Sequence, residues 1–505
     1  MSDPTPSEPA QSDWSMFSHR ADRFLEKTAQ YVQLGVNPGD YYTSIWTRDA
    51  AYILRDQFVA GDTHNVLQCL YFIWSYQIDL NSQKIVYGRG SPELNFRIQH
   101  ADAMIKEKFS GALPTTINQH DGVSEVYARN PDIDSTALMI STTSWILDTY
   151  LKAGLYSCYE DLKSGPKPLS SADYKKQLYN LSKDVRQSLS SRLNQLRIAP
   201  SRAILEPAEL IEFIIPRMDA AIHYLASRDI DNDGLLEQGY NEDWMDTALR
   251  AGKIVYDQAS WILAASDFSS LLCEIGEYNM ASKLTSMAER TVNAVEEKLW
   301  SEEDGAYIDI KYDGVEGKNN EERMLTQDVS LYLMAITENS LNDNLSKRFK
   351  AINNSNDANC RRQIIRHSFD KKGSRLVTHK AIEERAARTL ETIKNRIWKE
   401  GTRPLITEKE LKRTGPWVLD SNQYHNHTFW PWMTGIEMLA RSRFQRYGEC
   451  NDLLSELTRE NYSQTLAYYE WINPVTGKGS GAFPFRTGIS TIRMALSDTL
   501  LSHYS

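Results

Sequence analysis

Cysteine is scarce and scattered in this chain. The five cysteines are odd in number and form no CxxC pair; they stand at Cys69, Cys158, Cys273, Cys360 and Cys450. Zinc sites and disulfide frameworks need closely spaced or paired cysteines. The sequence therefore predicts neither, and it indicates a reducing, cytoplasmic location.

The chain also lacks a long apolar run and an excess of basic residues. No hydrophobic stretch reaches the length that a membrane span needs. The formal net charge is -10, whereas a nucleic-acid partner calls for a net basic face. A P-loop and a GxSxG nucleophile elbow are missing too. We therefore expect no membrane, no nucleic acid and no cofactor as partners.

The N-terminal residues, MSDPTPSEPAQSD, have neither a basic start nor an apolar core. They do not follow the pattern of a signal peptide, and residues 1–14 are predicted to be a disordered tail. No Pro/Ser-rich linker divides the chain further on, so residues 15–505 are predicted to form one domain. We interpret Asn339–Arg375, which is rich in Asn, Ser, Lys and Arg, as an excursion or mobile loop within it.

What the chain has is an ordinary globular composition with helical patterning. Hydrophobic residues make up 41% and charged residues 25%, which provides ample core. Apolar residues recur at helical spacing in about a dozen segments of ordinary length. Strand-like pieces are few, namely Ala306–Tyr312 and Lys84–Tyr87. The predicted helices are Trp14–Leu34, Trp46–Ala60, His64–Leu80, Ser135–Ala153, Ser171–Leu196, Pro207–Ser227, Tyr256–Ile275, Met280–Leu299, Thr326–Thr337, His379–Trp398, Tyr424–Tyr447, Leu453–Leu466 and Ser490–Ser502.

Four of these helices open in a similar way, with an Asp followed by small and apolar residues. The aspartates are Asp49, Asp134, Asp257 and Asp328. Asp is a good N-cap, so capping is the simplest interpretation. The recurrence also indicates one helical hairpin used repeatedly. Repeated hairpins can close into a ring whose loops converge at one end.

Two segments place a carboxylate beside tryptophan and apolar residues: NEDWMDTALR at Asn241–Arg250 and EWINPVTG at Glu470–Gly477. Alone, each could be a solvated charge or a turn. Together they offer what hydrolysis of a glycosidic bond needs, one acid for the leaving oxygen and one base for water. A third block, YHNHTFWPW at Tyr424–Trp432, lies between them. Its rings suit a sugar, whose C–H faces stack on apolar surfaces.

In the order of these blocks the chain resembles the six-hairpin (α/α)6-barrel glycosidases. That group includes glucoamylases, the glucosidase domain of glycogen debranching enzymes, processing α-glucosidases, and glucosylglycerate or mannosylglycerate hydrolases. The resemblance runs from about Tyr41 to Ile492. It rests on four blocks: WTRDA at Trp46–Ala50, WMDTALR at Trp244–Arg250, YHNHTFWPW at Tyr424–Trp432 and EWINPVTGKGSGAFPF at Glu470–Phe485. It implies an all-α (α/α)6 toroid and inverting hydrolysis of a terminal α-glucosidic bond in carbohydrate metabolism.

The resemblance also implies roles for the two carboxylates. Asp246 follows the pair Trp244–Met245 and matches the general acid, with Asp243 as its competitor; Glu470 matches the base. The acid must stay protonated near neutral pH, so its pKa must be raised by burial or a nearby carboxylate. One departure is Arg486 in FPFRTG, where relatives often carry Trp, and it concerns the fine shape of the pocket.

Further residues are candidates for contact with the sugar. The Arg48–Asp49 pair can form hydrogen bonds to adjacent sugar hydroxyls, although a salt bridge at a helix N-cap would use the same residues. Asp134 is interpreted first as an N-cap and second as a sugar ligand. The predicted substrate-binding set is Trp46, Arg48, Asp49, Asp134, Trp244, Tyr424, His425, Trp430 and Trp432.

No metal site is predicted. His425 and His427 lack a third ligand. DIDNDG at Asp229–Gly234 opens like an EF-hand loop, but Tyr240 stands at the twelfth position, where a bidentate Glu is required. A full EF-hand is therefore disfavoured, and calcium binding there stays open.

Two other classes of function stay open as well. One is a phosphorylase, epimerase or lyase on the same ring. The other is a non-catalytic, glucoamylase-like domain that binds sugar and regulates a partner. The sequence does not choose among glycogen branches, maltooligosaccharides, trehalose-type disaccharides and glucosylglycerate-like osmolytes as the substrate, and it does not indicate the oligomeric state.

Overall fold

The computed structural model describes residues 8–32, 34–82, 84–118, 122–163, 207–308, 324–337, 379–401, 403–461 and 464–504. The predicted helix Ser171–Leu196 and the predicted excursion Asn339–Arg375 lie outside the described residues.

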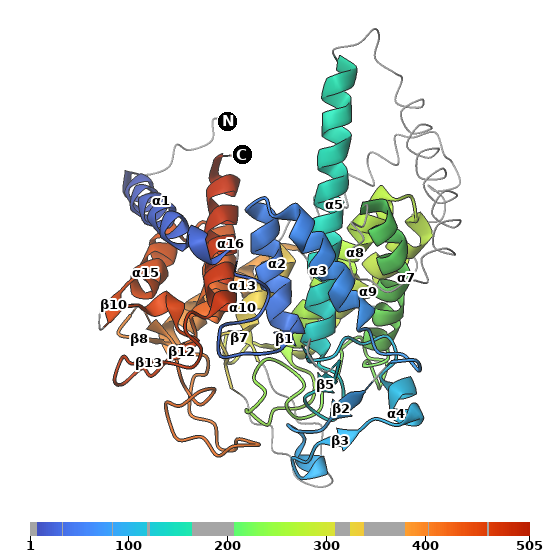
Figure 1. The fold of residues 1–505 in the computed structure, drawn as a ribbon. Helices are drawn as coiled ribbons and strands as arrows, with labels where there is room; N and C mark the ends of the chain where they lie inside the picture. The colour runs from blue at the N-terminus through green and yellow to red at the C-terminus, as the bar shows by residue number, and fades with distance from the viewer. Residues whose placement is uncertain are drawn as a thin grey trace.

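Six helices form a closed inner ring. Each packs against the next, and the last packs against the first; Figure 1 shows these helices from the side. In ring order they are α2 (Thr47–Val59), α5 (Ile133–Lys163), α8 (Val255–Glu274), α10 (Val329–Thr337), α14 (Pro431–Arg443) and α16 (Arg486–Tyr504). Nearly every residue of α8 and α14 is buried, as expected of helices with neighbours on all sides.

A second set of helices covers the ring from outside. They are α1 (Glu8–Thr28), α3 (Thr63–Ser75), α7 (Pro207–Ala226), α9 (Tyr278–Lys298), α13 (His379–Arg396) and α15 (Tyr447–Leu457). In α9 the buried residues, among them Ala281, Leu284, Ala288 and Val295, recur at helical spacing, which is the one-sided pattern of a covering helix.

Outer and inner helices alternate along the chain, α1, α2, α3, α5 and so on. Because each outer helix leads into an inner one and the ring closes, the predicted (α/α)6 toroid is confirmed. The short helix α4 (Ala103–Lys108) lies in the connection between α3 and α5.

The strands lie in the connections between helices. The largest sheet has the strand order β1-β4-β5-β2-β3, formed by β1 (Ile45–Trp46), β4 (Thr116–Ile117), β5 (Ser124–Val126), β2 (Ile85–Tyr87) and β3 (Gln99–His100). Four two-stranded pairs follow, namely β6 (Trp300–Ser301) with β7 (Ala306–Tyr307), β8 (Trp398–Lys399) with β9 (Arg403–Pro404), β10 (Glu460–Asn461) with β11 (Gln464–Thr465), and β12 (Trp471–Ile472) with β13 (Gly479–Ser480).

Several predicted boundaries are wrong. The helix expected over Tyr424–Tyr447 begins only at Pro431, because proline suits the first turn of a helix and not its interior. The helix expected over Leu453–Leu466 is α15, which ends at Leu457. Helix α1 begins at Glu8, so the tail predicted for residues 1–14 overlaps its first turns, where Pro9 is tolerated.

The capping interpretation of the four recurring aspartates is also wrong for three of them. Asp49, Asp134 and Asp257 lie inside the first turn of their helices. Asp328 precedes α10, but its carboxylate accepts hydrogen bonds from Thr326, Trp244 and Arg250. The carboxylates of Asp49, Asp134 and Asp328 therefore serve contacts between segments.

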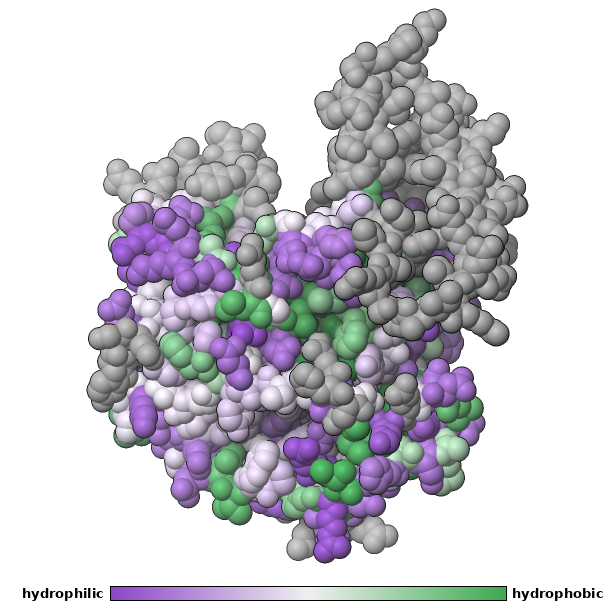
Figure 2. All heavy atoms as spheres, in the orientation of Figure 1, coloured by the Kyte–Doolittle hydropathy of each residue, from purple (hydrophilic) through white to green (hydrophobic). Residues whose placement is uncertain are grey.

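Hydrophilic and hydrophobic side chains alternate over the face shown in Figure 2, and several hydrophobic ones gather at its lower end, where the strands and long loops lie. Among the described residues, no helix has the length and apolar character that crossing a membrane would require.

Candidate active site

The predicted site residues stand at the beginnings of inner helices. Trp46 precedes α2, and Arg48 and Asp49 lie in its first turn; Asp134 lies in the first turn of α5. Asp246, Tyr424 and Glu470 belong to the connections that enter α8, α14 and α16. In Figure 1 the starts of α2, α5 and α16 lie at the lower end of the ring. The N-terminal ends of helices carry partial positive charge, which favours oxygen-rich or anionic groups.

One pocket at this end is lined by every predicted site residue except Asp134. Asp134 is fully buried behind Arg48, and its Oδ2 accepts a hydrogen bond from Nη1 of Arg48 at 3.3 Å. The structure therefore places Asp134 as a support for Arg48 and not in the pocket wall. Sequence reasoning missed five further lining residues: Pro38, Tyr42, Tyr52, Phe485 and Thr487. The run YYTSIW and the motif FPFRTG held a signal for three of them.

Asp243 and Asp246 differ in their surroundings. Oδ2 of Asp243 accepts hydrogen bonds from Nε of Arg250 at 2.7 Å and from Gln238 at 2.8 Å, and Oδ1 accepts one from the backbone N–H of Met245 at 2.7 Å. These donors fix the Asp243 side chain, which braces the loop. Asp246 lines the pocket, and its Oδ1 has no hydrogen-bond partner among the described residues.

The environment of Asp246 favours its protonated form. Burial raises the pKa of Asp246 to about 8, with Arg48 opposing and the negative charges of Asp243 and Glu470 adding to the rise. Nδ1 of His425 lies 3.6 Å from Oδ1 of Asp246. Burial also holds the pKa of His425 well below its usual range, so the imidazole is neutral near pH 7 and does not stabilise a carboxylate as a cation would.

Glu470 is held from two sides. The hydroxyl of Tyr42 donates to Oε1 at 2.6 Å, and the backbone N–H of Ala482 donates to Oε2 at 2.7 Å. Burial raises the pKa of Glu470 to about 7, while these two hydrogen bonds lower it. Gly481, with φ +76°, allows the close approach: a Cβ there would lie 2.4 Å from Oε2 of Glu470. The two hydrogen bonds thus orient the base candidate and offset part of the cost of burying its charged form.

The Arg48–Asp49 pair forms a polar part of the pocket wall. Nη2 of Arg48 lies 3.6 Å from Oδ2 of Asp49, whose Oδ1 accepts a hydrogen bond from the hydroxyl of Thr487 at 2.7 Å. Guanidinium donors and a carboxylate acceptor in a fixed arrangement can bind neighbouring hydroxyls of one sugar ring.

Aromatic rings make up much of the remaining wall. The ring of Trp244 meets Trp432 edge to face at 5.0 Å and Trp430 at 5.6 Å, and His425 stacks on Trp430 at 4.8 Å. Tyr424 has φ 47°, a conformation that non-glycine residues rarely adopt and that concentrates at functional sites. The block predicted to stack on sugar is therefore rigidly packed and faces the pocket.

Arg486, the departure from the family pattern, does not enter the pocket. Its side chain turns toward the carbonyl of Asn37 and the carboxylate of Asp40. It thereby fastens the segment that carries Tyr42, while the neighbouring Phe485 and Thr487 line the pocket.

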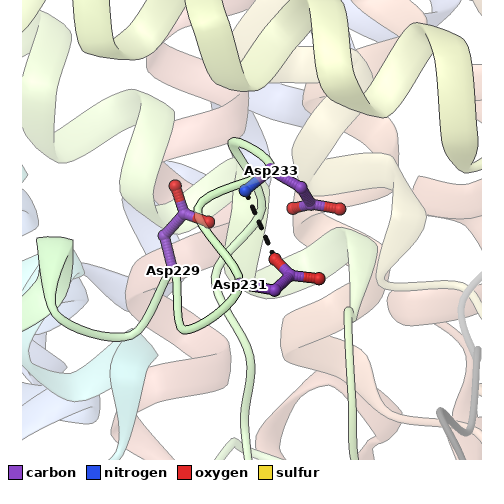
Figure 3. Close-up of side chains that lie close together, drawn as sticks. All are labelled: Asp229, Asp231 and Asp233. Carbon is purple, nitrogen blue, oxygen red and sulfur yellow. Dashed lines mark hydrogen bonds between the residues drawn. The ribbon is translucent and has the colours of Figure 1, made fainter.

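The acidic loop DIDNDG brings three carboxylates together (Figure 3). Ligand atoms of Asp229, Asp231 and Asp233 lie within 4.8 Å of one another. The chain supplies its own cations here. Nζ of Lys253 lies 2.6 Å from Asp231 and 2.7 Å from Asp233, and Arg290 lies 3.2 Å from Asp229. These ion pairs account for the cluster as a structural feature.

A larger cavity of about 500 Å³ shares no lining residue with the pocket above. Its buried cations are already paired, Arg228 with Glu242 at 2.6 Å and Lys253 with the acidic loop. Of the carboxylates that line it, Glu93 is exposed and Glu237 lies 3.4 Å from Lys253. It offers no pair of buried carboxylates, so the pocket with Asp246 and Glu470 is the candidate active site.

Comparison with known proteins gives the following. No protein-family model matches the chain, and no curated protein matches its sequence. Among solved structures, those with a similar fold include proteins described as glycosidases and glycoside hydrolases.

One is a GH63 mannosylglycerate hydrolase from Thermus thermophilus in complex with glucose, 13% identical, with 95% of this chain and 100% of that chain covered and a TM-score of 0.48. Another is a wild-type glycosidase, 9% identical, with 98% and 99% covered and a TM-score of 0.48. A third is a rhamnosidase from Klebsiella oxytoca with rhamnose bound, 11% identical, with 98% of this chain and 65% of that chain covered and a TM-score of 0.47.

Proposed function

We propose that this protein is a glycoside hydrolase that cleaves a terminal α-glucosidic bond with inversion, with Asp246 as general acid and Glu470 as general base. The observation that carries the proposal is the unequal pair of buried carboxylates in one pocket. Burial raises the pKa of Asp246 to about 8, and two hydrogen bonds support the ionised form of Glu470. Two carboxyl groups whose environments favour the protonated form of one and the ionised form of the other typically act as acid and base.

The reaction would run as a single displacement. Asp246 gives its proton to the glycosidic oxygen as the bond to the anomeric carbon breaks, and the leaving group departs as a neutral alcohol. Glu470 takes a proton from the attacking water, which forms the new bond on the opposite face of the ring. The products are a free sugar of inverted configuration and the alcohol. Proton exchange with solvent then returns Glu470 to its ionised form and Asp246 to its protonated form.

The finer parts of the proposal have different supports. The terminal position of the scissile bond is supported by the polar part of the pocket, where Arg48 and Asp49 are held by hydrogen bonds from the protein itself. The α-glucosidic specificity and the inversion are supported by the four sequence blocks that resemble the six-hairpin glycosidases. A cytoplasmic location is part of the same proposal and is supported by the scarcity of cysteine.

The decisive experiment is a panel of α-glucosides and α-mannosides with release of the free sugar measured and its anomer followed by NMR. We expect release of the β-anomer of glucose. Release of the α-anomer would contradict inversion. Turnover that depends on inorganic phosphate would favour a phosphorylase instead, and measurable sugar binding without turnover of any glycoside would favour the regulatory domain.

A further inference from the structure

A loop of the connection into α14 runs along the candidate pocket from its acid side to its base side. We define the rim loop as residues 409–427. At one end the backbone N–H of Gly415 donates to the carbonyl of Thr247 at 3.1 Å, and the Asn241 side chain donates to the carbonyl of Gly415 at 2.9 Å. Toward the other end, the carbonyl of Asn422 accepts a hydrogen bond from Asn473 at 2.9 Å.

The rim loop is therefore fixed to both halves of the proposed machinery. Thr247 follows Asp246 directly, and Asn473 belongs to the turn that follows Glu470. The end of the same loop supplies Tyr424 and His425 to the pocket wall. The rim loop therefore lies next to the segment that carries Asp246 and contributes to the pocket wall.

The rim loop exposes large apolar side chains at this place. Trp417 is 54% exposed and Val418 is 91% exposed. From the neighbouring connection, the ring of Phe96 packs against Gly415, since a Cβ on that glycine would lie 2.8 Å from Cζ of Phe96. Phe96 is itself 37% exposed. These three side chains lie outside the hydrophobic core of the described residues. Exposed apolar patches beside a cleft commonly mark ligand binding.

We propose that Trp417, flanked by Val418 and Phe96, is a binding surface for the leaving group, and that this group is a neutral unit with an apolar face, such as a second sugar ring. This inference rests on the proposed function. Trp417 is the second residue after Gly415, so its Cα lies within about 7 Å of that contact with the acid segment. An indole ring offers the flat apolar surface on which the C–H face of a sugar stacks.

Charge in the pocket agrees with a neutral leaving group. The lining carboxylates are Asp49, Asp246 and Glu470, and the lining cation is Arg48. Arg48 is already engaged by Asp49 and Asp134. A small anionic leaving group would find no unpaired cation in the pocket lining and would be repelled by ionised Glu470, and the exposed cations of the rim loop are screened by solvent.

The test compares two substrates that differ only in the leaving group. α-Glucosyl fluoride has a leaving group too small to reach Trp417, whereas maltotriose extends a disaccharide past it. We expect Trp417→Ala to lower kcat/KM for maltotriose about two- to tenfold, mainly through KM, and to leave α-glucosyl fluoride unchanged. Trp417→Phe should restore most of the loss. Tyr278→Ala removes an exposed aromatic ring from outer helix α9, where the ring is 43% exposed, and should affect neither substrate.

The outcomes separate this inference from the proposed function. If the wild-type protein hydrolyses neither substrate nor any other glycoside, the proposed function fails. If it hydrolyses both and Trp417→Ala changes both equally or neither, the assignment of Trp417 is overturned. Faster hydrolysis of glucosylglycerate than of any neutral glucoside would overturn the neutral leaving group.

Discussion

At the scale of single residues, the environment of each carboxylate says more about its role than the motif does. Asp243 and Asp246 stand three positions apart and are alike in sequence. The structure gives Asp243 three donors and leaves Oδ1 of Asp246 without one among the described residues. A carboxyl group that must release and regain a proton needs this lack of fixed donors.

Leaving-group dependence should separate the acid from the base. We expect Asp246→Asn to lose about 10²–10⁴-fold or more on natural glucosides and to keep most activity on glucosides with activated leaving groups, which need little acid help. Glu470→Gln should impair both kinds of substrate, because water activation is lost. Steady-state kinetics on an aryl glucoside and maltose measure this. Discrimination by Asp243→Asn in place of Asp246→Asn would move the acid to Asp243.

The raised pKa of Asp246 also predicts an effect on stability. A carboxyl group whose pKa is about 8 in the folded protein and ordinary when unfolded favours folding at low pH, and this contribution is lost as the pH rises toward 8. Asp246→Asn removes the group. We expect the Tm of the variant to exceed that of the wild type, and by more at pH 9 than at pH 5. An equal difference at both pH values would contradict the buried, protonated carboxyl.

The same pair predicts a narrow pH optimum. Activity needs Glu470 ionised and Asp246 protonated, and burial raises their pKa values to about 7 and about 8. We expect kcat/KM to rise and fall with apparent pKa values near these, which belong to the coupled pair. Tyr42→Phe removes a hydrogen bond that lowers the pKa of Glu470, so the rising limb should move to higher pH.

A matched control for Tyr42→Phe is Tyr52→Phe, which removes a hydroxyl from the same pocket but not from Glu470. It should leave the rising limb in place even where it raises KM. A shift of that limb by both variants, or by neither, would count against Tyr42 as the residue that positions the base.

At the scale of elements, the residue that directly follows β13, Gly481, decides where Glu470 lies. We expect Gly481→Ala to reduce kcat strongly, because a Cβ at this positive φ would meet the Glu470 side chain at 2.4 and 2.7 Å. Gly276→Ala is the matched control: its φ is +85° and nothing lies within 4 Å of the added atom. Both variants should lose Tm from backbone strain, with a further loss for Gly481→Ala from the clash with Glu470, and only Gly481→Ala should lose activity.

Helices were the part of the fold that the sequence predicted best. Outer helices such as α9 and α13 repeat apolar residues on one face, and their predicted bounds differ from the observed ones by two residues or fewer. The prediction failed at Tyr424–Trp430, where aromatic residues are dense but serve a pocket wall. Of the five-stranded sheet the sequence indicated only Lys84–Tyr87, which contains β2, because strands of two or three residues are too short to show a period of two.

The sequence motifs of the candidate site could be predicted, but the contacts between residues far apart in the sequence could not. WTRDA, WMDTALR, YHNHTFWPW and the Glu470 segment all precede or open inner helices, which is why separate motifs meet in one pocket. Tyr42 was missed because its role comes from a hydrogen bond to Glu470 across 428 positions of sequence. No local pattern records such a contact.

At the scale of the whole molecule, the ring closes where the first and last inner helices meet. Nε of Arg493 in α16 lies 3.1 and 3.0 Å from the two carboxylate oxygens of Asp56 in α2, and its Nη1 donates to Thr28 and Leu25 at the end of α1. The side chains of the ion pair are 11% and 3% exposed. This contact joins the beginning of the toroid to its end.

Breaking this contact should therefore weaken the ring as a unit. We expect Arg493→Met to lower the free energy of unfolding by about 3–5 kcal/mol at pH 7.5, because it leaves a buried carboxylate without its partner. Chemical denaturation followed by circular dichroism measures the loss. Asp498→Asn is the control on the same helix: its pair with Arg443 is 42% exposed on the Asp side, so the loss should stay below about 1 kcal/mol.

The pH dependence of the loss identifies its cause. Burial raises the pKa of Asp56 to about 6 even with Arg493 beside it, so at pH 5 the carboxyl is largely protonated in both proteins and the ion pair no longer distinguishes them. The difference between Arg493→Met and the wild type should shrink at pH 5. A difference that stays constant from pH 7.5 to pH 5 would mean that the arginine stabilises the closure through packing and its bonds to α1, and not through Asp56.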